Sequence, residues 1–428
     1  MDKLHEWPAH VAAASIQQGK LKPSQLMAAY ADRIEAFESK VGAFIHLDVE
    51  RALRQASLLD SQTPQGLLFG IPIGVKDIID TARMPTSYGS PIYEGHRPAA
   101  DAACVNEASL QGAVVMGKTV TTEFAIFHPG KTANPHNLAH TPGGSSSGSA
   151  AAVAAHMVPL AFGTQTAASV FRPSSFCGVV GYKPSYGLIQ RGGVKTLAES
   201  FDTVGLIGNC VMDVALFAAA ASRRHELIPG PAVDRQTPTV GLFRTPHWDA
   251  AEPASQAAVL GLADRLRRQG VKVIDIEAPA VFKDLLQAQT DAMLAEAAIA
   301  LGYEYTHKKS LCSPKLVEVI ETGNAMTWER VQAANETIVQ ARAAIRDVFR
   351  GVDVLLSPAA PGEAPEGLTA TGDPVFGRSW SALRTPGLTL PGAVGPKGLP
   401  IGVLLCGPQG QDRAFLAAAL AIEKLASL

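Results

Sequence analysis

Short runs of apolar residues, separated by glycine and proline, constrain the fold of this chain most strongly. They begin after Gly70 and recur at residues 71–79, 113–116, 158–162 and 204–207, where valine, isoleucine and leucine are frequent. Runs of this length, bounded by turn residues, are typical of fully buried strands. Because helix-forming segments lie between them, the pattern predicts strands that alternate with helices.

The later part of the chain shows the order of elements expected in a parallel sheet. Residues 240–243 form a strand-type run, an Ala/Leu-rich segment follows at 253–270, and a second run occupies 271–276. A strand, a helix and a strand in this order make one unit of a parallel sheet. Apolar spacings of three and four over residues 331–348 predict a further helix, before a strand at 352–356. The sequence therefore predicts an α/β fold with a large mixed, mostly parallel sheet covered by helices on both faces.

Helical periodicity dominates the first part of the chain. Ser24 is a candidate N-cap, and one face of the helix that follows would carry Leu26, Tyr30, Ile34 and Phe37. We expect residues 1–65 to consist mainly of helices.

Charge and cysteine content exclude several classes of protein. Lys plus Arg number 37 and Asp plus Glu 39, and no polybasic run occurs, so neither a nucleic-acid partner nor an anionic membrane is expected. The five cysteines are scattered and odd in number, which argues against a disulfide framework and a thiolate zinc site. The N-terminus lacks the pattern of a secretory signal, and the most apolar windows are shorter than a membrane span. We therefore expect a cytoplasmic protein.

A phosphate-loop pattern occurs at residues 112–119, which read GAVVMGKT. A phosphate loop needs a flexible segment between its glycines, so that backbone N–H groups can wrap the phosphates. Here the intervening residues are themselves a strand-type run. The pattern favours a buried strand over a nucleotide hydrolase, which stays an alternative.

A nucleophile-elbow pattern, G-x-S-x-G, is centred on Ser146. An elbow requires a buried strand that leads directly into it, whereas residues 134–142 have the composition of a loop. A helix-forming run follows at residues 150–155, so the serines lie at the start of a helix. An esterase that uses Ser146 and a histidine is therefore a second, weaker alternative.

Two further positions combine residue types that suit nucleophilic catalysis. Ser169 follows Ala167 and Ala168, whose small side chains would let a substrate carbonyl approach backbone N–H groups. Lys76 lies in an apolar run, and burial would lower its pKa towards the range of a general base. Taken alone, Ser169 is equally consistent with a turn or cap, and Lys76 with an ion pair to Asp77 or another buried carboxylate.

Several motifs of this chain occur together and in a fixed order. They read GVKD (74–77), GKT (117–119), GGSSSGSAAAV (143–153), TQTAASVFRP (164–173), CGVVGYKPS (177–185), SFDTVG (200–205) and GLPIG (398–402). With these motifs the chain resembles the amidase signature family of serine hydrolases. The resemblance implies a single domain over residues 1–428, with N-terminal helices at 1–65, a signature core with the catalytic residues at 66–225, and a C-terminal α/β portion at 226–428 that shapes the substrate pocket. A proline- and charge-rich stretch at 223–238 is typical of a linker near the last boundary.

The resemblance implies a Ser, cis-Ser, Lys triad. It places the nucleophile at Ser169, the bridging serine at Ser145, after a cis peptide bond from Gly144, and the lysine at Lys76. A buried neutral lysine can activate a serine through an intervening hydroxyl, which donates and accepts at once. Neither a metal nor an organic cofactor is implied.

The same resemblance assigns the oxyanion hole to backbone N–H groups of Thr166, Ala167 and Ala168. Relatives usually have glycine in the pair before the nucleophile, so the two alanines depart from the family pattern. If either position required a positive φ, alanine would add strain and misaim an oxyanion donor.

The implied activity is cleavage of the C–N bond in linear amides, with aryl amides and carbamates as further substrates. Arg172 and Phe127 are the residues that we expect at the substrate, and Arg172 is equally consistent with a structural role. A small-molecule amide or carbamate is thus the expected partner, and a homodimer is one assembly left open. The main alternative within the family is the A-type subunit of an amidotransferase, which releases ammonia from glutamine for a partner protein.

Overall fold

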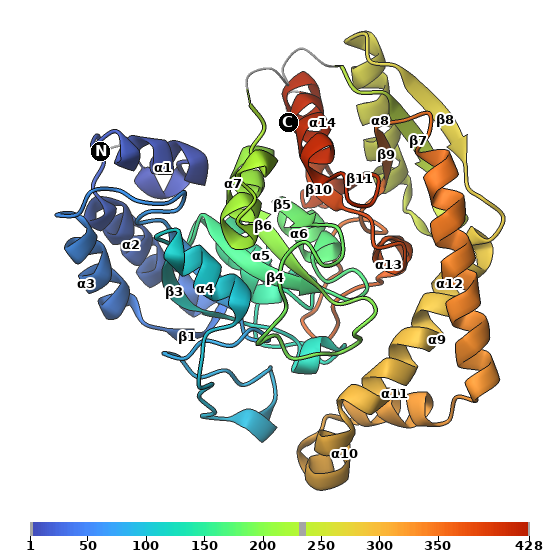
Figure 1. The fold of residues 1–428 in the computed structure, drawn as a ribbon, viewed down its shortest axis with the longest axis horizontal. Helices are drawn as coiled ribbons and strands as arrows, with labels where there is room; N and C mark the ends of the chain where they lie inside the picture. Colours follow the sequence, from blue (N-terminus) through green and yellow to red (C-terminus); the bar gives the residue numbers. More distant parts are fainter. Residues whose placement is uncertain (1–2, 231–236, 427–428) are drawn as a thin grey trace.

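The computed structural model describes residues 3–230 and 237–426, which build an 11-stranded sheet (Figure 1). The order of strands across the sheet is β1-β3-β2-β4-β6-β5-β10-β11-β9-β7-β8. The strands are β1 (Phe44–Leu47), β2 (Pro72–Lys76), β3 (Val114–Thr119), β4 (Leu160–Gln165), β5 (Val180–Lys183), β6 (Thr203–Gly208), β7 (Val240–Arg244), β8 (Val273–Glu277), β9 (Val354–Pro358), β10 (Gly387–Val394) and β11 (Pro400–Cys406).

The helices alternate with these strands along the chain, as the sequence predicted. They are α1 (Ala9–Gln17), α2 (Pro23–Val41), α3 (Val49–Leu59), α4 (Ala103–Leu110), α5 (Ser147–Ala154), α6 (Phe171–Cys177), α7 (Val211–Ser222), α8 (Pro253–Arg268), α9 (Phe282–Ala300), α10 (Gly302–Lys308), α11 (Pro314–Asn324), α12 (Trp328–Val348), α13 (Val375–Ala382) and α14 (Asp412–Ala426). Within the described part of the chain, no helix has both the length and the apolar character that crossing a membrane requires.

The sheet is mixed. Strands β3, β2 and β4 pair in parallel on one side of the sheet, and β9, β7 and β8 do so on the other. Between these groups, β4, β6, β5, β10, β11 and β9 pair in antiparallel fashion, and β1 adds an antiparallel edge. The predicted strand–helix–strand unit of residues 240–276 is confirmed as β7, α8 and β8.

Helices cover both faces of the sheet, which two neighbouring residues of β4 demonstrate. The ring of Phe162 lies 4.4 Å from the ring of Phe217 in α7. A Cβ atom on Gly163 would lie 2.8 Å from Ser146 Oγ, at the start of α5. Because consecutive side chains of a strand point to opposite faces, α7 covers one face and α5 the other. Both faces belong to one hydrophobic core, to which strands and helices from the whole chain contribute.

The predicted N-terminal helix is present as α2, but its start differs from the expectation. Pro23 is its first residue and Lys22 is the N-cap. Proline is favoured at this first position because its fixed φ suits a helix and its missing N–H costs nothing there. Ser24 is thus inside the first turn, where its hydroxyl donates to Asp60. Of the predicted linker, residues 231–236 lie outside the described residues.

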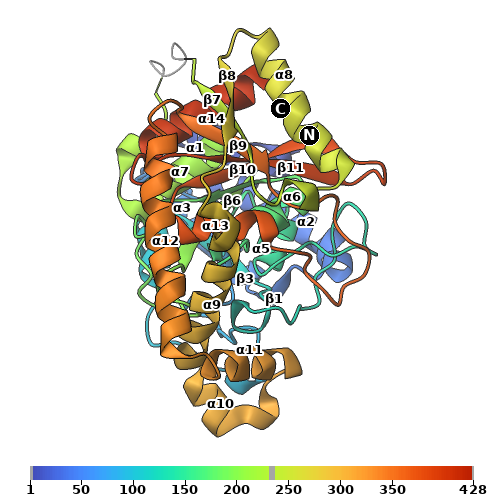
Figure 2. The same cartoon turned by 90° about the vertical axis from the view of Figure 1, so that its right-hand side faces the viewer.

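Helices α9, α10, α11 and α12 form an arm at one side of the sheet (Figures 1 and 2). The arm is fixed to loops from the first half of the chain through Glu304 of α10. Its Oε1 accepts a hydrogen bond from Tyr93 Oη at 2.8 Å and lies 2.6 Å from Lys195 Nζ. The arm thereby covers the pocket described next.

Candidate active site

Lys76 ends strand β2, and its side chain is fully buried. Its Nζ donates to Ser145 Oγ at 2.7 Å and to Thr164 Oγ1 at 2.8 Å. Asp77 does not pair with it. The Asp77 carboxylate instead lies 3.2 Å from Nζ of Lys118, so Lys76 forms no ion pair with any described residue.

The environment of Lys76 favours a neutral amine. Burial lowers the pKa of Lys76 well below its ordinary value, and the negative charge of Asp202 opposes this effect in part. A neutral amine has a lone pair and can accept a proton from a hydroxyl. The amine that touches Ser145 can therefore act as a base.

Ser145 begins the segment that leads into α5, and the peptide bond between Gly144 and Ser145 is cis, as the resemblance implied. Nη2 of Arg172 donates to the carbonyl of Gly144 at 2.7 Å. The serine itself is 2% exposed, and its hydroxyl lies where it reaches both Lys76 and the pocket.

Ser169 lies between β4 and α6, and it lines the same pocket as Ser145. No hydrogen bond joins its hydroxyl to another of the described residues. The link from Lys76 to Ser145 is thus formed, whereas the link from Ser145 to Ser169 is not. A serine hydroxyl rotates freely, and hydrogen bonds of this kind often tighten only when substrate binds.

The loop of residues 166–169 presents unused N–H groups. All four of its carbonyls accept hydrogen bonds, whereas none of its four N–H groups donates to a described residue. The donors to the carbonyls are Gln289 Nε2, Ser381 Oγ and the N–H groups of Arg172 and Ser146. A loop held by its carbonyls, with free N–H groups beside a pocket, is suited to hold an oxyanion.

The two alanines before Ser169 fit this loop without backbone strain. Neither Ala167 nor Ala168 is among the non-glycine residues with positive φ. The additional methyl group of Ala168 is accommodated by Gly377 of α13, since a Cβ atom at position 377 would lie 2.4 Å from Ala168 Cβ. The small residue has moved from the loop to the helix that packs on it.

A narrow pocket of about 30 Å³ lies over the two serines, between the loop of residues 166–169 and the arm. Phe127 lines it, as expected, and most of the other lining side chains are apolar. The arm contributes Met293, Ala297 and Val319. A wider groove of about 680 Å³ lies between α12 and α14, and its described lining contains no serine, cysteine or lysine.

Arg172 also lines the pocket, and it is 4% exposed. Besides the Gly144 carbonyl, its guanidinium donates to the carbonyl of Gly372 at 2.6 Å and to Thr371 Oγ1 at 3.0 Å. These bonds show a structural role, which the sequence had left open. The guanidinium has no carboxylate partner among the described residues, so its charge is also available to a substrate.

The two competing patterns of the sequence have structural explanations. The phosphate-loop pattern is the buried strand β3, in which Lys118 Nζ donates to Ile79 O and Thr86 Oγ1, both at 2.6 Å. Ser146 Oγ bonds to backbone atoms of Thr164, with two contacts of 3.2 Å, and does not line the pocket. Neither a nucleotide site nor an elbow nucleophile is formed by these residues.

One group of side chains has the composition of a metal site. His10, Cys210 and Asp213 each bring a ligand atom within 4.8 Å of the others. His10 Nδ1 and Asp213 Oδ1 are 2.7 Å apart, which is a hydrogen-bond distance. None of these residues lines the pocket of the serines, so a metal bound there would not touch the reacting atoms.

Comparison with known proteins agrees with the geometry. The family described as Amidase matches residues 25–416. The chain belongs to the amidase family. This amidase is 32% identical to the A-type subunit of glutamyl-tRNA(Gln) amidotransferase from Anaeromyxobacter sp. (strain K), over 98% of this chain and 95% of that protein.

Solved structures share the whole fold of this amidase. A crystal structure of an amidase superposes with a TM-score of 0.89 at 26% identity, over 98% of this chain and 99% of that chain. The native peptide amidase from Stenotrophomonas maltophilia superposes with a TM-score of 0.82 at 27% identity, over 98% and 96% of the two chains. Fold and family are thus the same from end to end.

Sequence reasoning missed several residues that hold this site. Thr164 is the second acceptor for Lys76, Ser381 fixes the Ala167 carbonyl, and the carboxylate of Asp202 accepts from Thr166 Oγ1 at 2.5 Å. Thr164 and Asp202 lie inside the quoted motifs, so their position was a usable signal. Ser381 lies in no motif, and only the packing of α13 brings it to the loop.

Proposed function

We propose that this amidase is a serine hydrolase that cleaves the C–N bond of linear amides through an acyl-enzyme on Ser169. The observation that carries the proposal is the 2.7 Å hydrogen bond from the buried amine of Lys76 to Ser145, at the base of the pocket that Ser169 lines. A base, a bridging hydroxyl and a nucleophile are the parts that serine-based acyl transfer needs.

In the proposed cycle, Ser169 Oγ attacks the amide carbonyl while its proton passes to Ser145, whose own proton passes to Lys76. The free N–H groups of residues 166–169 bind the oxygen that becomes negative. The relay then returns a proton to the leaving nitrogen, the C–N bond breaks, and the acyl group stays on Ser169. Water attacks this ester by the same route, which releases a carboxylic acid and restores the three side chains.

The pocket supports a substrate without a positive charge. Its lining contains no aspartate or glutamate, whereas it does contain the guanidinium of Arg172. A buried ammonium group would lack a partner there, and an unpaired buried charge is costly. Small neutral amides fit this environment, as do aryl amides and carbamates beside Phe127. A substrate carboxylate would meet Arg172, so monoamides of dicarboxylic acids are included.

An A-type amidotransferase subunit is the second candidate, and the 32% identity to such a protein favours it. That role requires glutamine, whose α-ammonium group needs an acidic partner. The lining of the pocket supplies none. The isolated chain is therefore proposed to act as a hydrolase in its own right.

A panel of purified-enzyme assays tests the proposal. It contains short aliphatic amides, anilides, monoamides of dicarboxylic acids, aryl carbamates and glutamine. We expect turnover of at least one uncharged or anionic amide, little glutaminase activity, and loss of turnover in Ser169→Ala but not in Ser146→Ala. Glutamine as the sole substrate, or activity only with a co-purifying protein, would favour the amidotransferase instead.

A further inference from the structure

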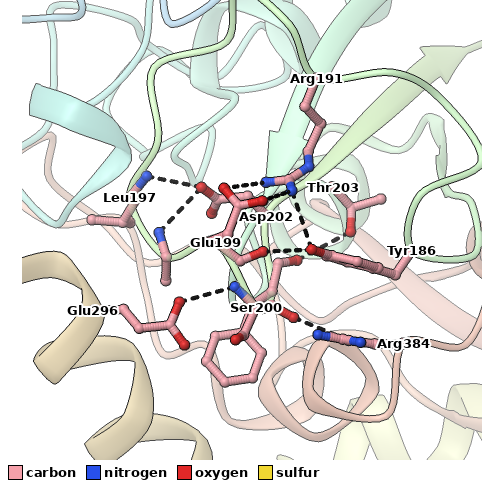
Figure 3. Close-up of polar contacts among 11 residues, drawn as sticks. Tyr186, Arg191, Leu197, Glu199, Ser200, Asp202, Thr203, Glu296 and Arg384 are labelled. Carbon is pink, nitrogen blue, oxygen red and sulfur yellow. Dashed lines mark hydrogen bonds and ion pairs between the residues drawn. The ribbon is translucent and has the colours of Figure 1, made fainter. Parts of the chain in front are cut away.

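Asp202 is a buried carboxylate that no step of the proposed cycle uses. Its Oδ1 accepts a hydrogen bond from Thr166 Oγ1 at 2.5 Å. Its Oδ2 accepts from the N–H groups of Leu197 at 2.8 Å and Ala198 at 3.1 Å. Figure 3 shows the carboxylate between these donors. Three hydrogen bonds to one buried carboxylate fix its position.

The register of the sheet explains why Asp202 meets the oxyanion loop. Strands β4 and β6 are antiparallel, and Gln165 lies opposite Thr203. The next residue along β4, Thr166, therefore lies opposite Asp202. Because Thr166 is the first residue of the loop that ends at Ser169, a carboxylate held at Asp202 fixes the start of that loop.

Asp202 also acts on the base of the proposed relay. Its negative charge raises the pKa of Lys76, against the larger lowering effect of burial. Burial raises the pKa of Asp202 itself to about 6, and the hydrogen bond from Thr166 opposes that rise. The two groups thus titrate as neighbours across the range in which the enzyme would work.

The other charged groups around this site have partners of their own. On the loop that carries Asp202, Arg191 pairs with Glu199, and Glu296 of α9 accepts from the N–H of Ser200 at 2.9 Å (Figure 3). Further groups with partners are Arg384 with Ser200 O, Asp77 with Lys118, and Arg172 with the carbonyls of Gly144 and Gly372. Asp202 is the carboxylate that acts on Lys76.

We propose that Asp202 is a positioning residue of this site, which holds the oxyanion loop through Thr166 and balances the charge of Lys76 during the relay. The inference rests on the proposed function and adds a residue to it. Asp202 does not touch the substrate. It links the orientation of the oxyanion donors to the protonation of the base, so one substitution should disturb both.

The change Asp202→Asn separates this role from a purely structural one. The amide keeps the shape of the side chain but has no charge, and its NH₂ group cannot accept from Leu197 or Thr166. We expect serine reactivity at its optimum pH to fall by ~10- to 100-fold, as expected for a misplaced catalytic loop. We also expect the acidic limb of the pH profile to move to lower pH, because Lys76 loses the charge that favours its protonated form. A structural role alone would lower the rate without moving the limb.

The hydrogen bond to Thr166 has an opposite signature. Thr166→Val leaves the carboxyl group of Asp202 but removes a bond that lowers its pKa. We expect this variant to lose rate while its acidic limb moves to higher pH, because Asp202 then becomes ionised only at a higher pH. Thr166→Ser keeps the hydroxyl and should restore both. Glu199→Gln is the matched control, because it removes a carboxylate from the same loop at a side chain that is 69% exposed and pairs only with Arg191.

Labelling with a fluorophosphonate provides a readout that needs no known substrate. Ser169 Oγ would form a bond to phosphorus while the P–F bond breaks, fluoride leaves, and the serine proton passes to the Ser145 and Lys76 relay. The rate of the mass increase is measured by intact-protein mass spectrometry from pH 5 to 10 for the wild type and the four variants. Unfolding temperatures show whether each variant is folded.

The outcomes distinguish the two proposals. Labelling of Ser169 in the wild type, with opposite shifts in Asp202→Asn and Thr166→Val and no shift in Glu199→Gln, supports the role of Asp202. Labelling of Ser169 with the same pH profile in wild type and folded Asp202→Asn overturns that role and leaves the hydrolase proposal intact. A wild-type enzyme that is labelled elsewhere, or not at all, overturns the proposed function itself.

Discussion

The amine of Lys76 lies 2.7 Å from the hydroxyl of Ser145, in a region that excludes solvent from both side chains. A lysine in such a place contributes to catalysis and costs stability at the same time, because an ammonium group is poorly accommodated without water. The predictions below use this conflict and the contacts that surround it.

Replacing Lys76 by methionine should separate activity from stability. Methionine has a similar shape without the amine, so the proposed base is lost while the packing is kept. We expect kcat to fall by ~10²–10⁴-fold, the usual contribution of a general base. The unfolding temperature should stay the same or rise. Full activity in a folded Lys76→Met variant would show that another group activates the nucleophile.

The stability of the wild type relative to this variant should depend on pH. Folded Lys76 has a pKa well below the ordinary 10.5, so between these two values the unfolded chain binds a proton that the folded chain does not. Stability therefore rises with pH in this window. We expect urea unfolding to show a stability advantage of Lys76→Met that shrinks as the pH approaches about 10.5. A pH-independent difference would mean that the buried amine is charged.

Thr164 is the second acceptor for the lysine amine, at 2.8 Å. Thr164→Val keeps the shape but leaves the amine with one hydroxyl partner, so its lone pair is aimed less well at Ser145. One such bond is worth about 1–1.5 kcal/mol, which corresponds to a roughly tenfold loss in kcat. Thr164→Ser should retain most of the rate. Equal kinetics in the valine and serine variants would show that this contact has no catalytic effect.

Gly377 gives the oxyanion loop room for the methyl group of Ala168. A Cβ atom at position 377 would lie 2.4 Å from Ala168 Cβ, so Gly377→Ala should push the loop away from its place. We expect a loss in kcat of up to ~10²-fold with a smaller change in KM, because oxyanion donors act mainly in the transition state.

The double variant Ala168→Gly with Gly377→Ala supplies the control. Removing the methyl group from the loop makes space for the one on the helix, so part of the lost rate should return. If the two changes were simply additive, the two positions would not be coupled and the account of the alanine pair would be wrong.

The motifs of the sequence predicted the parts of the site that depend on local order. Lys76, Ser145, Ser169 and the loop of residues 166–169 lie within short segments, and the structure brings all of them to one pocket. Ser381 and Gly377 were not predictable in this way, because they belong to α13 and reach the loop only through tertiary packing. Asp202 lies in a quoted motif, yet its partner Thr166 follows from the pairing of β4 with β6.

The fold was predicted to a similar extent. The apolar runs located most strands, and the β7–α8–β8 order predicted a parallel pair correctly. The antiparallel centre, formed by β6, β5, β10 and β11, could not be predicted from the runs. A buried strand has the same residue pattern in either direction, and its direction is set by the path of the chain between strands.

Trapping the acyl-enzyme tests the central claim most directly. The wild type is mixed with an activated aryl amide or carbamate, quenched in acid within the first turnover, and digested for peptide mass spectrometry. We predict a mass increase equal to the acyl group on the peptide that contains Ser169, and none in Ser169→Ala or Lys76→Met. An acyl group on another residue, or one that persists in Ser169→Ala, would contradict the account.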